Sequence, residues 1–347
     1  MAGPAALIVN PAAGGGRGPR AAAAVAAELA ALGVACEVTE SASLAHAREL
    51  AVAAAGRGAV PVAVGGDGLA GALAGALAAC PGAVLGLVPA GRGNDLARVL
   101  GIPAEPRAAA RLLAGAAPRP LDLIGVAAPG QPEAVVAGSV YAGLPSVAGE
   151  IANATRWLAG PAVYPVAALR VLAGWRPVTF GLVRGGAGPQ DGAGQQDAAD
   201  QQDRAGRQDR ADAQDGPGPR ARWEFTGYAV VIANIAYFGA GMMVAPPARP
   251  DDGLLDIVAM RHGPRLAFLR VLLSVRTGSH VSRPEVSLDR AAAVTVTMDR
   301  AMPVAADGET LPWARPLPAG TPLTVRALPA ALKVLAPPVA DPRPGAR

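Results

Sequence analysis

Short apolar runs and alanine-rich amphipathic stretches alternate along the first hundred residues. The apolar runs predict strands at 5–9, 34–39, 60–64 and 84–88. The stretches between and after them predict helices at 21–33, 44–55 and 69–79, and a short helix that ends at Leu100. Because strands and helices alternate with short connections, the sequence predicts βαβ units and a parallel sheet.

The alternation ends at about Leu121. From there on, apolar runs predict strands at 135–140, 178–183, 229–234, 255–260, 293–298 and 323–327, without regular helices between them. One helix-like stretch, 148–175, is interrupted by Pro161 and Pro165. This pattern is typical of a mostly antiparallel domain, and we expect a β-sandwich.

The two patterns divide the chain into an α/β protein of two domains. We expect a first domain at 1–122 and a second at 123–327, with 328–347 returning to the first domain and ending in a disordered tail. Residues 185–220 contain no Val, Ile, Leu or aromatic residue, so they cannot bury a core. We expect a disordered insertion there, either a tolerated loop expansion or a regulatory segment.

Composition narrows the function classes only a little. The bias toward Ala, Arg, Gly and Pro extends through the whole chain, and Lys333 is the only lysine, so we attribute the bias to genome composition. The net charge is +4, and the basic residues are scattered without interleaved aromatic residues, which argues against nucleic acid as a partner. Attraction to phosphates or to an anionic membrane surface remains.

The chain carries no sign of export or of membrane insertion. Cys36 and Cys80 have no metal-binding or redox spacing and fit a reducing cytoplasm. The first ten residues lack a basic segment followed by a long apolar one, so we expect no signal peptide. No run of eighteen uncharged apolar residues occurs, so we expect no transmembrane segment.

Three glycine-rich turns follow predicted strands. Asn10-Pro11 and Gly14–Gly18 follow the first strand, Gly65–Gly68 the third, and Gly91–Asn94 the fourth. Taken alone, each is also compatible with an ordinary tight turn. Open α/β sheets bind ligands at the carboxyl ends of their strands, where all three turns would lie together. Since backbone N–H groups in such turns bind phosphate, the set predicts a nucleotide site, and we expect ATP.

Two acidic loops in the second domain carry further candidate chemistry. Asp251, Asp252 and Asp256 stand among glycine and proline residues, where carboxylates and backbone carbonyls suit a hard cation such as Mg²⁺. The alternative for this loop is a polar turn. Asp307-Gly308-Glu309 follows an apolar strand, where a carboxylate can deprotonate a substrate hydroxyl. The alternative for this segment is a hairpin turn.

In this order and spacing, the motifs resemble the diacylglycerol kinase catalytic family, which includes bacterial soluble lipid kinases and sphingosine kinases. The resemblance extends from about Ala6 to Val334 and omits only the insertion. The matching segments are Asn10–Gly14, Gly65–Gly68, Pro89–Arg98, Leu121-Asp122, Gly239–Ala245, Pro250–Asp256 and Asp307–Glu309. The resemblance implies a Rossmann-like first domain of the NAD kinase and phosphofructokinase type, a β-sandwich second domain, and ATP in the cleft between them.

The resemblance also implies roles for individual residues. Those implied to contact ATP are Asn10, Pro11, Gly14, Arg17, Thr39, Gly65, Gly66, Asp67, Gly68, Leu69, Gly71, Gly91, Arg92, Asn94 and Asp95. Asp307 or Glu309 would take the proton from a lipid hydroxyl that receives the γ-phosphoryl group. Asp252, with the carbonyls of Arg249 and Leu254, would hold a structural Mg²⁺, and a second Mg²⁺ would travel with ATP.

The implied activity is that of an ATP-dependent lipid kinase with diacylglycerol or a related lipid as the acceptor. Such a kinase would be cytoplasmic and would meet its membrane lipid by peripheral contact at the inner face of the membrane. The resemblance leaves a homodimer open. Two alternatives are an NAD kinase, which shares the Gly-Gly-Asp-Gly turn, and a non-catalytic nucleotide- or lipid-binding relative.

The chain departs from the family pattern around the glycine-rich turns. Leu69 stands where many members have Thr, and a Leu at this position is similar to the sphingosine kinase branch. No Glu occurs in the next turn, at 71–73. Arg17 and Arg92 stand in place of a Lys and a Thr. Arginine also binds phosphate, through a planar fork rather than a point charge. The missing Glu is the feature that supports the non-catalytic alternative.

Overall fold

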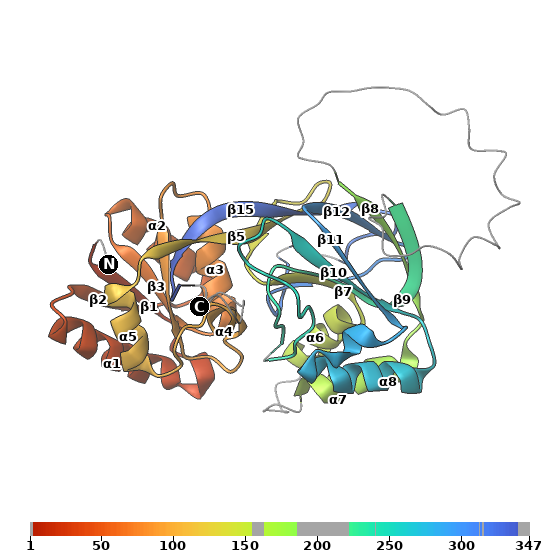
Figure 1. Cartoon of the computed structure of the whole chain (residues 1–347), viewed down its shortest axis with the longest axis horizontal. Helices are drawn as coiled ribbons and strands as arrows, with labels where there is room; N and C mark the ends of the chain where they lie inside the picture. The colour runs from red at the N-terminus through yellow and green to blue at the C-terminus, as the bar shows by residue number, and fades with distance from the viewer. Residues whose placement is uncertain are drawn as a thin grey trace, which may run out of the picture.

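Four parallel strands form the sheet of the N-terminal domain (Figure 1). The structure is a computed structural model that describes residues 3–154, 163–185, 222–239, 241–311, 313 and 316–338. The strands lie in the order β2 (Cys36–Glu40), β1 (Ala5–Val9), β3 (Val60–Gly65) and β4 (Val84–Pro89). β1 and β3 are buried along their whole length, because helices cover both faces of the sheet.

The helices of this domain pack in two layers. After a short 3₁₀ turn at Ala13–Gly15, α1 (Arg17–Ala31) covers one face together with α5 (Pro106–Gly115), and α2 (Leu44–Gly56), α3 (Asp67–Leu77) and α4 (Asp95–Val99) cover the other. Side chains alternate between the two cores, so that Leu7 of β1 faces the first and Ile8 the second. The predicted parallel α/β fold is confirmed, with α5 as an additional helix.

The C-terminal domain consists of two antiparallel layers that share one long strand, β9 (Arg222–Ala233). The first half of β9 pairs with β8 (Val178–Arg184), and the second half pairs with β7 (Ser139–Gly143) and β10 (Leu255–Arg261). The layer of β8 continues through β12 (Ala293–Met298), β15 (Leu323–Leu335), β5 (Pro118–Ala127) and β6 (Ala134–Val136). The other layer adds β11 (Val286–Ala291), β13 (Val304–Ala306) and β14 (Glu309–Thr310). The layers enclose one apolar core, and the predicted antiparallel β-sandwich is confirmed.

Helices cover the outer face of β7, β9 and β10. They are α6 (Leu144–Ala154), α7 (Val163–Gly174) and α8 (Arg265–Ser274), the last followed by 3₁₀ turns at Val275–Thr277 and Ser279–Ser282. Two predictions were wrong here. The sequence predicted no helix at α8, because its residues are apolar on nearly every side and show no clear helical period. The strand predicted at 135–140 is two strands, β6 and β7, separated at residues 137 and 138.

Two long strands, β5 and β15, join the domains (Figure 1). They pair antiparallel along most of their length, and Lys333 and Val334 of β15 also pair in parallel with β4. The domain boundaries predicted at residues 122 and 327 therefore fall inside continuous strands. The insertion predicted at 185–220 lies, from residue 186 on, outside the described residues, as does the predicted tail from residue 339.

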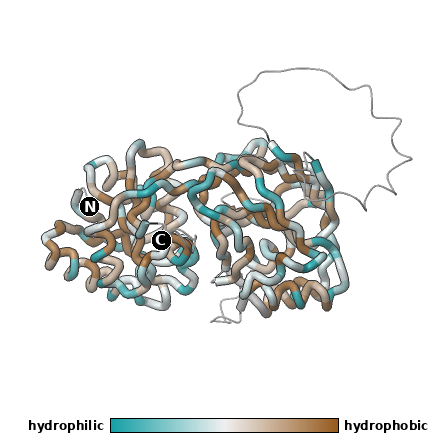
Figure 2. Tube along the Cα trace, viewed as in Figure 1, coloured by the Kyte–Doolittle hydropathy of each residue, from teal (hydrophilic) through white to brown (hydrophobic). Residues whose placement is uncertain are grey.

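Hydrophobic segments run through the strands of both domains (Figure 2). Their clusters fill the two faces of the parallel sheet, the interior of the sandwich and the face under α6, α7 and α8. Among the helices that the structure describes, none is both long and apolar enough to cross a membrane.

Candidate functional site

The three glycine-rich turns meet at the carboxyl edge of the parallel sheet. The turn after β1 starts at Asn10, whose N–H donates to the carbonyl of Val64 in β3 (3.2 Å). In the turn after β3, the Gly65 carbonyl accepts from the N–H groups of Ala90 (2.8 Å) and Gly91 (3.1 Å), which belong to the turn after β4. Because parallel strands end at the same edge, three local patterns form one continuous surface.

Close backbone contact explains the glycines in these turns. A Cβ at Gly91 would lie 2.3 Å from the Cα of Gly66, and a Cβ at Gly14 would lie 2.3 Å from the carbonyl oxygen of Ala90. The consecutive residues Gly14–Gly16 have φ values of 56°, 74° and 91°, which glycine adopts without strain. The turns therefore present backbone rather than side chains, as close approach to a phosphate requires.

The side chain of Arg17 connects the first turn to the third. Its Nε donates to the carbonyl of Gly14 (3.1 Å), and its Nη2 donates to the carbonyl of Gly91 (2.9 Å). Arg92 is exposed on the third turn. Two guanidinium groups therefore stand beside the turns, where their positive charge favours a phosphate ligand.

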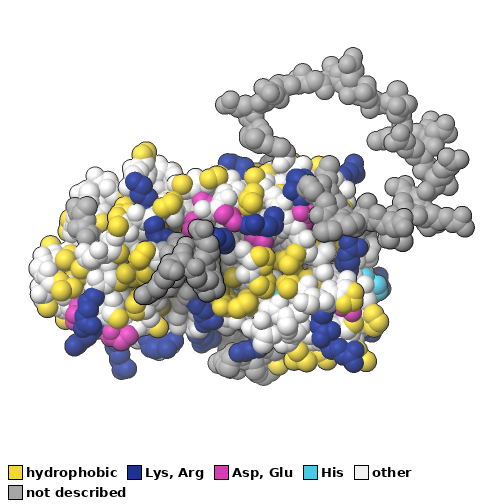
Figure 3. All heavy atoms as spheres, viewed as in Figure 1, with side chains coloured by type: hydrophobic (Ala, Val, Ile, Leu, Met, Phe, Trp, Pro, Cys, Tyr) yellow, Lys and Arg dark blue, Asp and Glu magenta, His cyan; other side chains and the backbone are white. Residues whose placement is uncertain are grey.

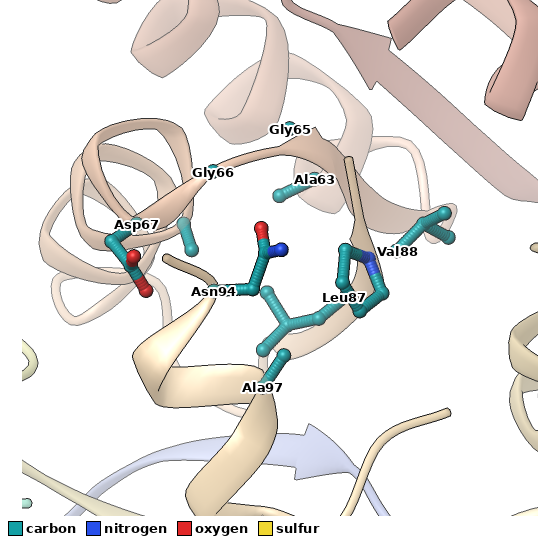
Figure 4. Close-up of a pocket in the computed structure, with 10 residues that line it drawn as sticks. Ala63, Gly65, Gly66, Asp67, Leu87, Val88, Asn94 and Ala97 are labelled. Carbon is teal, nitrogen blue, oxygen red and sulfur yellow. The ribbon is translucent and has the colours of Figure 1, made fainter. Parts of the chain in front are cut away.

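Asn94 closes the third turn (Figure 4). Its backbone is left-handed (φ 56°), its Oδ1 accepts from the N–H of Gly91 (2.9 Å), and its Nδ2 donates to the Gly91 carbonyl (3.1 Å). Asp67, the first residue of α3, accepts from the N–H of Leu96 (3.2 Å). The pocket between these turns has a volume of about 10 Å³, which is room for about one water molecule. A nucleotide would therefore lie over the turns rather than inside this pocket.

The other residues predicted to contact ATP lie at different depths. Thr39 is half-buried in β2, and Pro11 is exposed on the first turn. Gly68 is half-buried in the first turn of α3. The side chains of Leu69 and Asp95 are almost completely covered, with 2% and 4% of each residue exposed, so only their backbone can meet a ligand over the turns.

Asp307 reaches this region from the C-terminal domain. It occupies the turn of the β13–β14 hairpin with φ of 50°. Its Oδ1 accepts from the N–H groups of Gly138 (2.8 Å) and Ser139 (2.9 Å), and its Oδ2 accepts from that of Ala137 (2.9 Å). On the facing side, a Cβ at Gly71 of α3 would lie 2.7 Å from Oδ2. The carboxylate therefore lies where the two domains touch.

The surroundings of Asp307 leave it able to accept a proton. Burial raises the pKa of Asp307 above its ordinary value, the three N–H donors act in the opposite direction, and the charge of Asp67 raises it further. Oδ2 accepts one N–H bond whereas Oδ1 accepts two, so Oδ2 keeps a lone pair for a proton. Glu309, the second predicted catalytic residue, pairs through its backbone with Ala306, and its side chain lies outside the described part of the structure.

The buried residues Asp122 and Asn234 connect the 137–139 segment, which binds Asp307, to β5 and β15, the two strands that join the domains. Nδ2 of Asn234 donates to the carbonyls of Asp122 (2.7 Å) and Ala137 (3.0 Å). The Asp122 carboxylate accepts from the N–H groups of Gly253 (2.7 Å) and Ala330 (2.7 Å). The sequence patterns predict no role for either residue. The sequence did show a polar residue within an apolar run in each case. A polar residue buried in such a run needs hydrogen-bond partners, so its position could have indicated a structural role.

The loop predicted to hold a structural Mg²⁺ binds an arginine side chain. Oδ2 of Asp252 pairs with Nη2 of Arg290, and Oδ1 of Asp256 lies 3.3 Å from Nε of the same guanidinium. Oδ1 of Asp252 accepts from the N–H of Leu254 (3.1 Å). Burial raises the pKa of Asp256 to about 6 even beside this guanidinium. A guanidinium of the chain itself therefore lies beside both carboxylates, and a Mg²⁺ held by Asp252 and the carbonyls of Arg249 and Leu254 stays a prediction.

Metal binding by side-chain clusters finds no support elsewhere either. Within the described ranges, no group of three or more His, Cys, Asp or Glu side chains is arranged to hold a metal ion. The acidic loop at 251–256 has an internal ion pair at its base.

Two family models match the chain. The model described as "Diacylglycerol kinase catalytic domain" matches residues 4–126. The model described as "YegS C-terminal NAD kinase beta sandwich-like domain" matches residues 138–336. Together they cover both domains of the structure.

Individual proteins match over similar ranges. A diacylglycerol kinase of Mycobacterium tuberculosis (strain CDC 1551 / Oshkosh) is 31% identical over 95% of this chain and 94% of its own length. A protein of Stenotrophomonas maltophilia (strain K279a) named "Probable lipid kinase YegS-like" is 29% identical over 58% of this chain and 56% of its own. The crystal structure of a diacylglycerol kinase from Bacillus anthracis str. Sterne has a TM-score of 0.64 at 18% identity, covering 96% of this chain and 97% of that one, which shows a shared fold.

Proposed function

The chain belongs to the diacylglycerol kinase family, and from that premise we propose that it transfers the γ-phosphoryl group of ATP to the hydroxyl of diacylglycerol. The hydroxyl oxygen forms a bond to the γ-phosphorus, the bond from that phosphorus to the bridging oxygen breaks, and the hydroxyl proton passes to a base. The products are ADP and phosphatidic acid.

The observation that carries the proposal is the position of Asp307 across the domain junction from α3 and the glycine-rich turns. ATP lying over the turns would have its phosphates beside the backbone of Gly14–Gly16 and the guanidinium groups of Arg17 and Arg92. A Mg²⁺ that travels with ATP would neutralise further phosphate charge, because phosphoryl transfer depends mainly on positioning and electrostatic stabilisation. Oδ2 of Asp307 would then take the hydroxyl proton.

The departure at residues 71–73 has a structural basis that supports catalysis over the non-catalytic alternative. Gly71 lies against Asp307, so a longer side chain there would displace the carboxylate. A carboxylate therefore already stands at this turn of α3, and it comes from the other domain. The missing Glu is for this reason a weak argument against activity.

An NAD kinase finds less support. The Mycobacterium tuberculosis relative that matches over almost the whole chain is named a diacylglycerol kinase, and the shorter match carries a lipid kinase name. These names favour a lipid acceptor over a dinucleotide.

The experiment is a transfer assay with the purified full chain, γ-labelled ATP and Mg²⁺, offered diacylglycerol, a sphingoid base, a glycerophospholipid, a polyprenol or NAD in separate reactions. We expect label in diacylglycerol, lost in Asp307→Asn and kept in the matched control Asp299→Asn, which changes an exposed aspartate after β12. Label in another lipid would overturn the acceptor, and label in NAD would overturn the lipid kinase. ATP binding without transfer to any acceptor would establish the non-catalytic alternative.

A further inference from the structure

The outer face of α7 and α8 exposes large aliphatic side chains. Val166 and Leu169 of α7 are 50% and 49% exposed, and Leu266 and Leu273 of α8 are 70% and 71% exposed. These two helices contribute four of the nine large hydrophobic residues that are exposed in the described part of the chain. Both helices pack on the same outer face of β7, β9 and β10, and we call these four residues the aliphatic face.

Helical spacing places these residues on the side opposite the core. In α8, Leu266, Arg270 and Leu273 follow one another at i, i+4 and i+7, while Phe268 and Val271 are buried against the strands. In α7, Val166, Leu169 and Arg170 share a stripe at i, i+3 and i+4, while Ala167 and Leu172 are buried in the same cluster as α8. Each helix therefore exposes a stripe in which two aliphatic side chains stand beside an arginine.

The charged residues of the two chain segments that carry the aliphatic face are of one sign. Residues 163–184 and 257–284 contain no Asp or Glu. The arginines in these two segments are Arg170, Arg176, Arg184, Arg261, Arg265, Arg270, Arg276 and Arg283. Figure 3 shows basic and hydrophobic side chains together at the lower edge of the molecule, over α8. A surface of this kind is complementary to an apolar phase covered by negative charge.

We propose that the aliphatic face, with the flanking Arg170, Arg265 and Arg270, docks the protein on an anionic lipid bilayer. The four aliphatic side chains enter the boundary between headgroups and acyl chains. The arginine stems lie along the same apolar layer, while their guanidinium groups bind lipid phosphates. This inference rests on the proposed function, because it supplies the surface from which a membrane lipid would be taken.

The fold connects this surface to the candidate site. α6 contacts both α7 and β14, the strand that follows Asp307 in the hairpin. α6 therefore lies between α7, which carries part of the docking face, and the hairpin that carries the proposed base. A lipid that leaves the bilayer beside α7 would pass α6 to reach Asp307.

A second copy of the chain is a poorer occupant for this face. Symmetric pairing through the aliphatic face would bring the arginines of one copy against those of the other without an acidic partner in these segments. The acidic residues that flank the two segments along the chain are Glu150, Asp191, Asp256 and Glu285.

The experiment is vesicle flotation of the purified full chain with phosphatidylglycerol–phosphatidylcholine vesicles and with pure phosphatidylcholine vesicles. We expect binding to the mixed vesicles that salt weakens. Leu266→Gln with Leu273→Gln, and separately Arg265→Gln with Arg270→Gln, should each reduce partitioning by about tenfold or more. Leu32→Gln is the control, because Leu32 is also an exposed leucine (48%) but lies at the end of α1 in the other domain.

Several results would overturn the docking proposal. Equal binding of the double variants and the control would do so, as would equal binding to neutral vesicles. A wild-type dimer that becomes monomeric in the Leu266→Gln/Leu273→Gln variant would identify a second copy as the occupant. Thermal unfolding of each variant verifies that the fold is intact.

A parallel activity measurement separates this proposal from the proposed function. With diacylglycerol dispersed in detergent, the docking variants should keep wild-type activity, whereas with anionic vesicles they should lose it. If the wild-type chain binds vesicles but phosphorylates no acceptor, the docking proposal is supported and the proposed kinase function is wrong. Full activity without vesicle binding would do the reverse.

Discussion

Asp307 and Gly71 lie on different domains, yet a Cβ on Gly71 would come within 2.7 Å of Oδ2 of Asp307. The carboxylate has little freedom to move away from Gly71, because three backbone N–H groups of the 137–139 segment donate hydrogen bonds to it. The position of the proposed base, Asp307, therefore depends on residue 71 of α3 being a glycine.

Gly71→Ala should reduce activity by about tenfold or more, because the added methyl group displaces Asp307 from the position in which it meets the hydroxyl. The measurement is kcat/KM at saturating ATP. Gly149→Ala in α6 is the control, since nothing lies within 4 Å of its Cβ position. The control should be neutral or stabilise by roughly 0.5–1 kcal/mol. Equal activity of the two variants would show that Asp307 does not need its present position.

The pH dependence of activity should report the environment of Asp307. Burial and the charge of Asp67 raise the pKa of Asp307, and a base works only when deprotonated. Activity should therefore fall on acidification, and the fall should begin at a higher pH than for an ordinary aspartate.

Asp67→Asn tests the cause of that shift. Removal of the Asp67 charge should lower the pKa of Asp307 and move the acidic limb of the kcat/KM profile to lower pH, whatever it does to the rate itself. Asp299→Asn, a change at an exposed position, should leave the limb in place. A limb that stays fixed in Asp67→Asn would mean that another group titrates.

Removal of Mg²⁺ should leave the thermal stability of the nucleotide-free protein unchanged, because Arg290 already neutralises Asp252 and Asp256. Arg290→Ala should destabilise the protein by about 1–3 kcal/mol, since it leaves a buried carboxylate without its cation. The variant should also gain a melting temperature that rises with added Mg²⁺.

Thermal unfolding with EDTA and with Mg²⁺ measures both effects. Arg57→Ala is the control, because Arg57 pairs with Glu37 on the surface, where ion pairs contribute little. A wild-type protein whose melting temperature drops in EDTA would restore the structural Mg²⁺ that the sequence predicted.

His280 should make stability depend on pH below neutrality. The side chain is fully buried and its Nε2 lies 2.9 Å from the carbonyl of Val244. Burial lowers the pKa of His280 in the folded state, so the unfolded chain binds a proton more readily. The contribution is present above about pH 6.5 and is lost as the pH falls through the lowered folded-state pKa.

Melting temperatures between pH 8 and pH 5 measure this dependence. His280→Gln should flatten the curve relative to the wild type, whereas His262→Gln, a change at an exposed position, should keep the wild-type slope. Parallel curves for the wild type and His280→Gln would rule out His280 as the source.

The sequence predicted the N-terminal domain better than the C-terminal one. Strands such as β1 and β3 are apolar along their whole length and end in glycine turns, so their limits are local features. β15 continues to Leu335, well past the predicted end at 327, because its extension is stabilised by pairing with β5 and β4. α8 escaped prediction because its outer face also carries large apolar residues, Leu266 and Leu273, which obscure the helical period.

The candidate site shows the same division. The turns at 10–18, 65–68 and 91–94 were identifiable because clusters of glycine directly after apolar runs are local features of the sequence. The partners of Asp307 were not, since Ala137 lies 170 residues away in the sequence. The pairing of Arg290 with Asp252, 38 residues earlier, was likewise not predictable, because neither local sequence pattern carries information about the other.

The sequence by itself determined the parallel α/β domain, the antiparallel β-sandwich and the glycine-rich turns, because apolar period and turn chemistry are encoded over a few residues. Only the tertiary structure decided that Asp307 meets Gly71, that Arg290 pairs with Asp252, and that α7 and α8 expose an aliphatic face. These relationships depend on strands that pair over long distances in the sequence. The free energy that selects such pairs comes from packing, and local sequence patterns carry no information about it.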